Sequence, residues 1–211
     1  MPTDFWTISA GDPDYPQRLA SHTRSTEWST LFGLGRRGIL AEKCLGLVCS
    51  IRCPGAAVIK TYDAIREIRD ASVVVAGGFH SPMERECLDF LLKGEQPVII
   101  CPARTTATMR VPTAWRRGLE SGRLLVVSCF RNDVRRATQF SASSRNELVA
   151  ALSAAVLIPH ATPGGKADAI AQDVLQRGLP LFTFGDDGNQ LLLAQGAVAY
   201  GINRVKQATA T

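Results

Sequence analysis

The sequence predicts an α/β protein with a doubly wound, mostly parallel sheet. Short apolar runs rich in β-branched residues recur along the 211 residues, and polar segments of helix length separate them. These runs are apolar at nearly every position, so the strands should be buried on both faces, as in parallel sheets covered by helices. Strands and helices that alternate with short connections typically build doubly wound folds.

Seven apolar runs have the length and composition of strands. In chain order they are LGLVCSI (45–51), SVVVAG (72–77), PVIICPA (97–103), LLVVSCF (124–130), AAVLIPH (154–160), PLFTFG (180–185) and a short last strand at 197–200. Their spacing leaves room for a helix after each of the first six, as right-handed crossovers between parallel strands require.

The segments between these runs are predicted to be helices. They cover 56–69, 82–93, 112–121, a stretch opened by Arg145, 166–177 and 188–195. The second has the clearest start, with Ser81 as N-cap, Pro82 at the first helical position and Glu84 in the first turn. Residues 1–40 are less regular, and we expect a helical lead-in packed on a core of residues 41–203, with 204–211 as a short tail.

The charge of the chain favours an anionic partner. Its formal net charge is +5. One central stretch holds nine of the 19 arginines, namely Arg104, Arg110, Arg116, Arg117, Arg123, Arg131, Arg135, Arg136 and Arg145. Such clustering indicates a polyanion-binding surface, although solvated helix faces would give the same pattern.

Targeting and metal-binding patterns are not found in the sequence. No apolar run reaches the roughly 18 residues that span a bilayer, and the N-terminus has no basic-then-apolar signal, so we expect a cytoplasmic protein without membrane association. The six cysteines form no C-x-x-C pair. Cys49, Cys101 and Cys129 lie in or beside apolar strands, where a free thiol behaves as a small hydrophobe, so no metal site is predicted.

A candidate ligand site follows from the predicted topology, because ligands of open parallel sheets bind outside the carboxyl ends of the strands. Basic side chains, hydroxyls and glycine turns converge there, and both guanidinium groups and glycine N–H groups can hold phosphate. The candidate phosphate-binding residues are Ser50, Arg52, Gly77, Gly78, His80, Arg104, Arg110, Arg145, Asn146, Gly164, Gly165 and Lys166.

The stretch from Phe140 to Gly165 is the most informative part of this edge. Arg145 and Asn146 are predicted to open a helix, a buried strand follows, and a Pro-Gly-Gly turn enters the next helix. We expect the turn to leave backbone N–H groups unpaired at the positive end of that helix, with charge added by Lys166.

Catalytic motifs are poorly represented. The sequence has no G-x-G-x-x-G, no G-x-x-x-x-G-K-[ST] and no G-x-S-x-G, so the usual loops for dinucleotides, ATP and serine hydrolysis are missing. His80 and Glu84 could exchange protons, but no third group is seen to orient them. His160 can contact a ligand or merely cap its strand. These observations favour binding over catalysis, without a cofactor, and Phe79 and Phe130 are the candidates for stacking on bases.

Several short motifs, in order, resemble a known family. They are Tyr15-Pro16 with Leu19; Cys49-Ser50-Ile51-Arg52, an imperfect Gly-Ser-Arg; the Gly77-Gly78 turn; Arg145-Asn146 before VLIPHA; Pro163-Gly164-Gly165-Lys166; and NQLLLAQGA at 189–197. From about residue 15 to 196, the chain resembles the Rossmann-like core of the DprA/Smf DNA-processing proteins. More broadly it resembles the SLOG superfamily, which includes the LOG phosphoribohydrolases.

The resemblance implies a function. It implies binding of single-stranded DNA in DNA processing and recombination, a homodimer, and a RecA-like recombinase as partner. A SLOG-type site for a nucleotide or nucleotide-derived ligand is the alternative. A LOG-like phosphoribohydrolase is a third hypothesis, although Ala167 and Asp168 replace the rest of the LOG pattern after Pro163-Gly164-Gly165.

Overall fold

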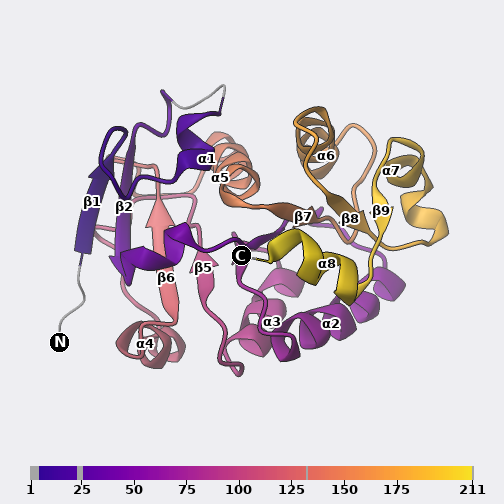
Figure 1. The fold of residues 1–211 in the computed structure, drawn as a ribbon, viewed down its shortest axis with the longest axis horizontal. Helices are drawn as coiled ribbons and strands as arrows, with labels where there is room; N and C mark the ends of the chain where they lie inside the picture. The colour runs from indigo at the N-terminus through magenta and orange to yellow at the C-terminus, as the bar shows by residue number, and fades with distance from the viewer. Residues whose placement is uncertain (1–4, 23–25, 132, 211) are drawn as a thin grey trace.

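The computed structural model describes residues 5–22, 26–131 and 133–210. These residues form one sheet with the strand order β1-β2-β6-β5-β4-β3-β7-β8-β9 (Figure 1). All seven predicted strands are present and parallel to one another: β3 (Leu45–Leu47), β4 (Val75–Gly77), β5 (Val98–Ile100), β6 (Leu124–Ser128), β7 (Ala155–Leu157), β8 (Leu181–Thr183) and β9 (Val198–Ala199). The predicted fold class is therefore confirmed.

Helices cover both faces of this sheet. One face carries α2 (Gly55–Asp70), α3 (Pro82–Leu91), α4 (Thr113–Glu120) and α8 (Ile202–Thr209), and the other carries α1 (Gln17–Ala20), α5 (Gln139–Leu152), α6 (Lys166–Gln176) and α7 (Gln190–Ala194). Successive strand residues point to opposite faces of the sheet and pack in two hydrophobic cores. Val75 packs under α2 and α3, whereas Ala76 packs under α5. This double burial explains why the strands are apolar at nearly every position.

The order of the strands places a switch point between β3 and β7. The chain moves outward from β3 to β6, returns through α5, and then continues with β7 on the other side of β3. The two strands are in register, with Leu45 opposite Ala155 and Leu47 opposite Leu157. Ligands of such sheets bind near the carboxyl ends of the strands that flank this point.

The described residues before position 41 differ from the predicted helical lead-in. They form β1 (Phe5–Ser9) and β2 (Thr30–Gly35), which pair antiparallel and extend the sheet beyond β6, whereas α1 has a single turn. Gly33 allows the Trp6 ring to cross the pair, because a Cβ there would lie 2.0 Å from the ring. These strands depend on the free edge of β6, a tertiary partner that local sequence does not show.

Two helix boundaries also differ from the prediction. The helix expected to open at Arg145 begins at Gln139, because Thr138 and Ser141 form a reciprocal capping box there. The expected tail forms most of α8, whose Val205 is fully buried against the core. The assignment of residues 1–40 and 204–211 as separate parts stays a prediction.

Candidate functional site

Arg145 is a buried cation with few partners. The early start of α5 places it in mid-helix, facing the carboxyl ends of β4 and β5, with 5% of its surface exposed. Its Nη1 lies 3.5 Å from the carbonyl oxygen of Cys101, and its buried Nε has no hydrogen-bond partner. Burial lowers the pKa of Arg145, partly opposed by the charge of Glu84. The folded chain therefore contains a guanidinium that is only partly hydrogen-bonded.

Glu84 does not form an ion pair with Arg145, since its carboxylate is committed to the start of α3. It accepts hydrogen bonds from the backbone N–H groups of His80, at 3.1 Å, and Ser81, at 2.9 Å. The hydroxyl of Ser81 in turn accepts from the Glu84 N–H, which completes a capping box. The N-terminus of α3 is thus closed by the chain itself, which leaves the guanidinium of Arg145 as a candidate contact for an anion at this edge.

Gly78 packs directly against the Arg145 guanidinium. A Cβ on Gly78 would lie 1.8 Å from Nη1 and 2.2 Å from Cζ, so a larger residue could not coexist with this guanidinium position. The following residue, Phe79, has a φ of 46°, in the left-handed region, and its ring packs over Gly77. The Gly-Gly turn predicted from the sequence therefore packs over the guanidinium group of Arg145.

A cavity of about 380 Å³ opens beside this pair, and we call it the Arg145 cavity. Its lining includes Gly78, His80, Arg104, Arg136 and Arg145, together with the apolar residues Phe79, Ile100, Pro102, Ala103, Met109, Trp115 and Ala137. Arg104 and Arg136 are exposed. A hydrogen bond joins their two loops, since the Thr105 N–H donates to the Val134 carbonyl at 2.8 Å. Three arginines from separate segments therefore converge on one cavity.

A second hollow of about 510 Å³ lies next to it, and we call it the Phe140 hollow. Its lining includes Arg135, Thr138 and Phe140, and it shares Arg136 with the Arg145 cavity. Phe140, in the first turn of α5, is 74% exposed, whereas the predicted stacking residues Phe79 and Phe130 are buried. Sequence reasoning overlooked Phe140 because its helix was expected to begin later.

Ser50 and Arg52 lie apart from the Arg145 cavity lining, at the β3–β7 switch point. The Ser50 N–H donates to the His160 carbonyl, and the Ser50 hydroxyl accepts from the Thr162 N–H at 3.0 Å. Ser50 thus holds two strand ends together, while Arg52 is exposed. Arg110 is also exposed, and it is not among the residues that line the Arg145 cavity.

The turn before α6 has no open N–H groups at its glycines. The Gly164 N–H donates to the carboxylate of Asp168 at 2.8 Å, and the Gly165 N–H donates to the Thr162 carbonyl at 2.9 Å. The prediction of unpaired N–H groups is wrong at these two residues. Asp168, in the first turn of α6, occupies the place that an anion would take.

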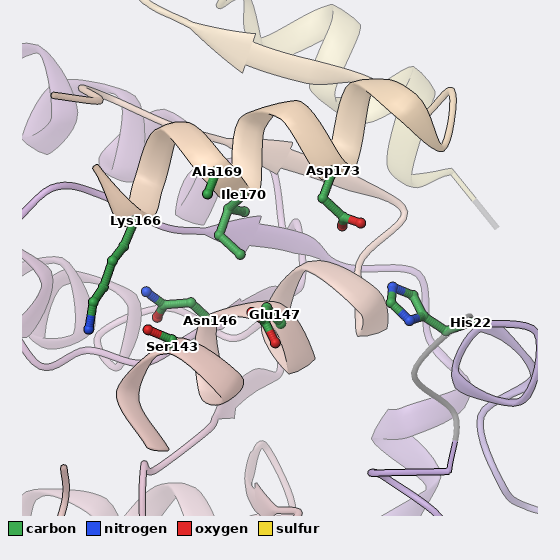
Figure 2. A pocket seen from close by; sticks show the side chains of 8 residues that line it. All are labelled: His22, Ser143, Asn146, Glu147, Lys166, Ala169, Ile170 and Asp173. Carbon is green, nitrogen blue, oxygen red and sulfur yellow. The ribbon is translucent and has the colours of Figure 1, made fainter. Parts of the chain in front are cut away.

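Asn146 and Lys166 face a different cavity. A hollow of about 180 Å³ between α5 and α6 is lined by His22, Ser143, Asn146, Glu147, Lys166, Ala169, Ile170 and Asp173. Figure 2 shows the Lys166 side chain reaching from the start of α6 toward Ser143 and Asn146. The Lys166 ammonium donates to the Gln139 carbonyl at 2.9 Å. Arg145 and Asn146 are neighbours in sequence, but they line different cavities on different faces of α5.

Of the predicted site residues, the structure gathers Gly78, His80, Arg104 and Arg145 around one cavity. A model of the DNA recombination-mediator protein A family matches residues 6–206. The chain belongs to this family. No curated protein sequence matches the chain.

Solved structures of the same family share its fold. DNA processing protein A (DprA) from Streptococcus pneumoniae is 18% identical, with a TM-score of 0.80 over 97% of this chain and 74% of that one. The Helicobacter pylori DprA, whose structure concerns its single-stranded DNA binding mode, is also 18% identical, with a TM-score of 0.74 over 97% and 95% of the two chains.

A more distant likeness extends the fold beyond this family. A molybdenum cofactor carrier protein from Chlamydomonas reinhardtii is 12% identical, with a TM-score of 0.52 over 81% of this chain and 99% of that one. The Rossmann-like fold and the DprA resemblance are thus confirmed. Among the helices of the described residues, none has the length and apolar character of a membrane-spanning segment.

Proposed function

We propose that the protein binds single-stranded DNA through phosphate contacts at the Arg145 cavity. The observation that carries this proposal is the state of Arg145: buried, with an unpartnered Nε and no carboxylate in ion-pair contact in the described chain. Burying a charged group costs several kcal/mol unless a counter-charge offsets it. A phosphate in the cavity would supply that counter-charge and could be gripped by two N–H groups of one guanidinium.

A strand fits this surface better than an isolated phosphate group. The Arg145 cavity and the Phe140 hollow share Arg136, and Arg104 and Arg135 line one each. Asp133 is the one carboxylate among the residues that line either hollow, so positive charge predominates. An exposed aromatic ring beside a basic track is typical of single-strand binding, since bases stack on it without sequence preference. Phe140 supplies such a ring.

A nucleotide-derived small ligand is the second candidate. The Arg145 cavity is lined by apolar residues that include Met109 and Trp115 as well as by arginines, which would suit a base joined to a phosphate. LOG-like hydrolysis is the third hypothesis, and it predicts release of free base from a nucleoside monophosphate. The homodimer, the recombinase partner and the cytoplasmic location stay predictions.

The test is the salt dependence of binding to a labelled oligo-dT, followed by fluorescence anisotropy. Each phosphate contact contributes about 0.7 to the slope of log K against log salt for single strands, so replacing both Arg104 and Arg136 with Ala should lower the slope by about 1.4. The matched control is the double variant Arg204→Ala/Lys206→Ala on α8, which also loses two exposed cations.

The outcomes separate the candidates. A reduced slope in the first double variant alone supports the proposed interface. Equal slopes for all three proteins would contradict it. An absence of strand binding, together with thermal stabilisation by a nucleoside monophosphate, would favour the small-ligand site.

A further inference from the structure

The Arg145 cavity combines buried and exposed lining residues. Arg145 itself is 5% exposed, whereas His80, Arg104 and Arg136 are exposed. The other buried residues of the lining are apolar, namely Phe79, Ile100, Ala103 and Met109. A ligand group that contacts Arg145 therefore lies largely out of solvent, while the rest of the ligand can contact the exposed residues.

The size of the cavity limits what can enter it. Its volume of about 380 Å³ is near the lower end of the roughly 300–1,000 Å³ that is typical of small-molecule sites, so it has room for about one nucleotide. A phosphate inside a strand is joined to a sugar on both sides, and both neighbouring stretches of strand would have to leave the cavity. A phosphate at the end of a strand is joined to one sugar only. The volume therefore favours the end of a strand over an internal phosphate.

The positive charge of the cavity exceeds what one internal phosphate balances. Arg104, Arg136 and Arg145 line the cavity, and no carboxylate of the described chain does. Glu84 is the acidic residue whose charge acts on Arg145, which leaves an excess of two positive charges. An internal phosphate carries one negative charge, whereas a phosphate monoester carries about 1.5 to 2 at pH 7. A monoester therefore matches the cavity more closely.

Arg145 has hydrogen-bond donors that are free to bind a phosphate. In the described chain its guanidinium makes one hydrogen bond, the 3.5 Å contact from Nη1 to the Cys101 carbonyl, and its buried Nε makes none. A monoester has three free oxygens, whereas an internal phosphate has two. Two oxygens of a monoester can accept from Arg145 as a bidentate pair, and the third stays available to Arg104 or Arg136.

We propose that the Arg145 cavity binds the terminal phosphate monoester of a single strand, which then continues past Arg136 to the Phe140 hollow. This rests on the proposed function, because it names the part of the strand that the cavity takes. A strand with hydroxyl ends can still offer an internal phosphate to Arg145, but with less charge and with two stretches of strand to accommodate. A 5′ phosphate, a 3′ phosphate and a free nucleoside monophosphate share this chemistry.

The test compares three oligo-dT strands of one length that carry the same internal fluorescent label. One has a 5′ phosphate, one has a 3′ phosphate, and one has hydroxyl groups at both ends. By fluorescence anisotropy, one phosphorylated strand should bind at least about fivefold more tightly than the hydroxyl-ended strand, and the other should gain less than about twofold. Because both phosphates add the same charge, a gain at one end only cannot come from non-specific attraction.

Two variants locate the effect. Arg145→Met should abolish the preference, because the guanidinium that contacts the monoester is lost. The double variant Arg204→Ala/Lys206→Ala, on α8, should keep it. Equal affinities for the three strands, equal gains at the two ends, or an unchanged preference in a folded Arg145→Met protein would overturn the proposal. Equal affinities with tight binding would leave the proposed function intact, whereas an absence of binding to any strand would count against both.

Thermal unfolding with thymidine 5′-monophosphate and thymidine 3′-monophosphate separates a strand end from a free nucleotide. An end preference on the strand, with little stabilisation by either mononucleotide, supports the proposal. Stabilisation by a mononucleotide without any end preference on the strand would overturn it and favour the small-ligand site.

Trp115 reports whether the end of the strand enters this cavity. It lines the cavity and is half-buried. The preferred strand should quench its fluorescence more than the hydroxyl-ended strand does, because the terminal base comes close to the ring. Trp115→Phe should lose this difference in quenching and keep the preference in affinity. Equal quenching by the two strands would show that the preferred end binds elsewhere.

Discussion

The two glycine turns at the carboxyl edge of the sheet look alike in sequence but differ in what they hold. Each follows a buried strand and enters a helix, and each helix start is closed by its own carboxylate, Glu84 on α3 and Asp168 on α6. The Gly77-Gly78 turn lies on the buried guanidinium of Arg145. The Gly164-Gly165 turn has open space around Gly164, and the adjacent Lys166 ammonium is bonded to a carbonyl.

The comparison shows that a glycine turn before a helix is not by itself an anion site. An anion needs backbone N–H groups without a partner. In both turns, a carboxylate of the following helix already accepts hydrogen bonds from some of these groups. Only the first turn adds a buried cation whose charge is not balanced by a contacting carboxylate. Phosphate binding is therefore expected at the first turn and not at the second.

The largest expected effect comes from Gly78→Ala. Its methyl group would displace the Arg145 guanidinium, so affinity for oligo-dT should fall at least about tenfold, with about 1–3 kcal/mol lost from the free energy of unfolding. The control is Gly38→Ala, where a Cβ meets nothing within 4 Å. If a folded Gly78→Ala protein bound oligo-dT as tightly as the wild type, the two glycine turns would not differ in phosphate binding.

Asp168→Ala should affect stability without weakening binding. Loss of the bond to the Gly164 N–H should reduce the free energy of unfolding by about 1 kcal/mol, measured by urea denaturation. Oligo-dT affinity should not fall, because the second turn is not part of the proposed interface. A decrease of more than about threefold would place the second turn in the DNA site.

Gly164→Ala should have an effect as small as that of Asp168→Ala. Gly164 has a φ of +69°, which alanine adopts with strain, so a loss of about 1 kcal/mol of folding stability is expected. Affinity for oligo-dT should equal that of the wild-type protein in the same anisotropy assay. A loss of affinity comparable to that of Gly78→Ala would make the two turns equivalent.

Most of the fold could be predicted from the sequence because the central strands are buried on both faces. Continuous apolar runs such as those around Val75 and Leu157 are compatible with few structures other than buried parallel strands. The helix capped by Ser81 has a complete capping box, which marks its start. The strands β1 and β2 could not be predicted in the same way, since their pairing depends on the edge of β6 and on Gly33 beneath Trp6.

The site was only partly predictable, for a physical reason that Arg145 and Asn146 illustrate. Sequence order shows that both residues are near the ligand edge, but helix phase decides which face each one serves. In the observed phase of α5, Arg145 faces inward and Asn146 lies against α6, and the start at Gln139 puts the exposed Phe140 in the first turn. That start is set by Thr138 and Ser141, a weaker signal than the Arg-Asn motif itself.

The most direct test of the account is the oligo-dT affinity of Arg145→Met measured beside its folding stability. Replacing a buried, partly satisfied charge with an apolar side chain of similar length is often neutral or stabilising, so the free energy of unfolding should not decrease. The affinity should fall at least about tenfold, because the buried phosphate contact is lost. A stable Arg145→Met protein that binds oligo-dT as tightly as the wild type would contradict the assignment of Arg145 as the centre of the interface.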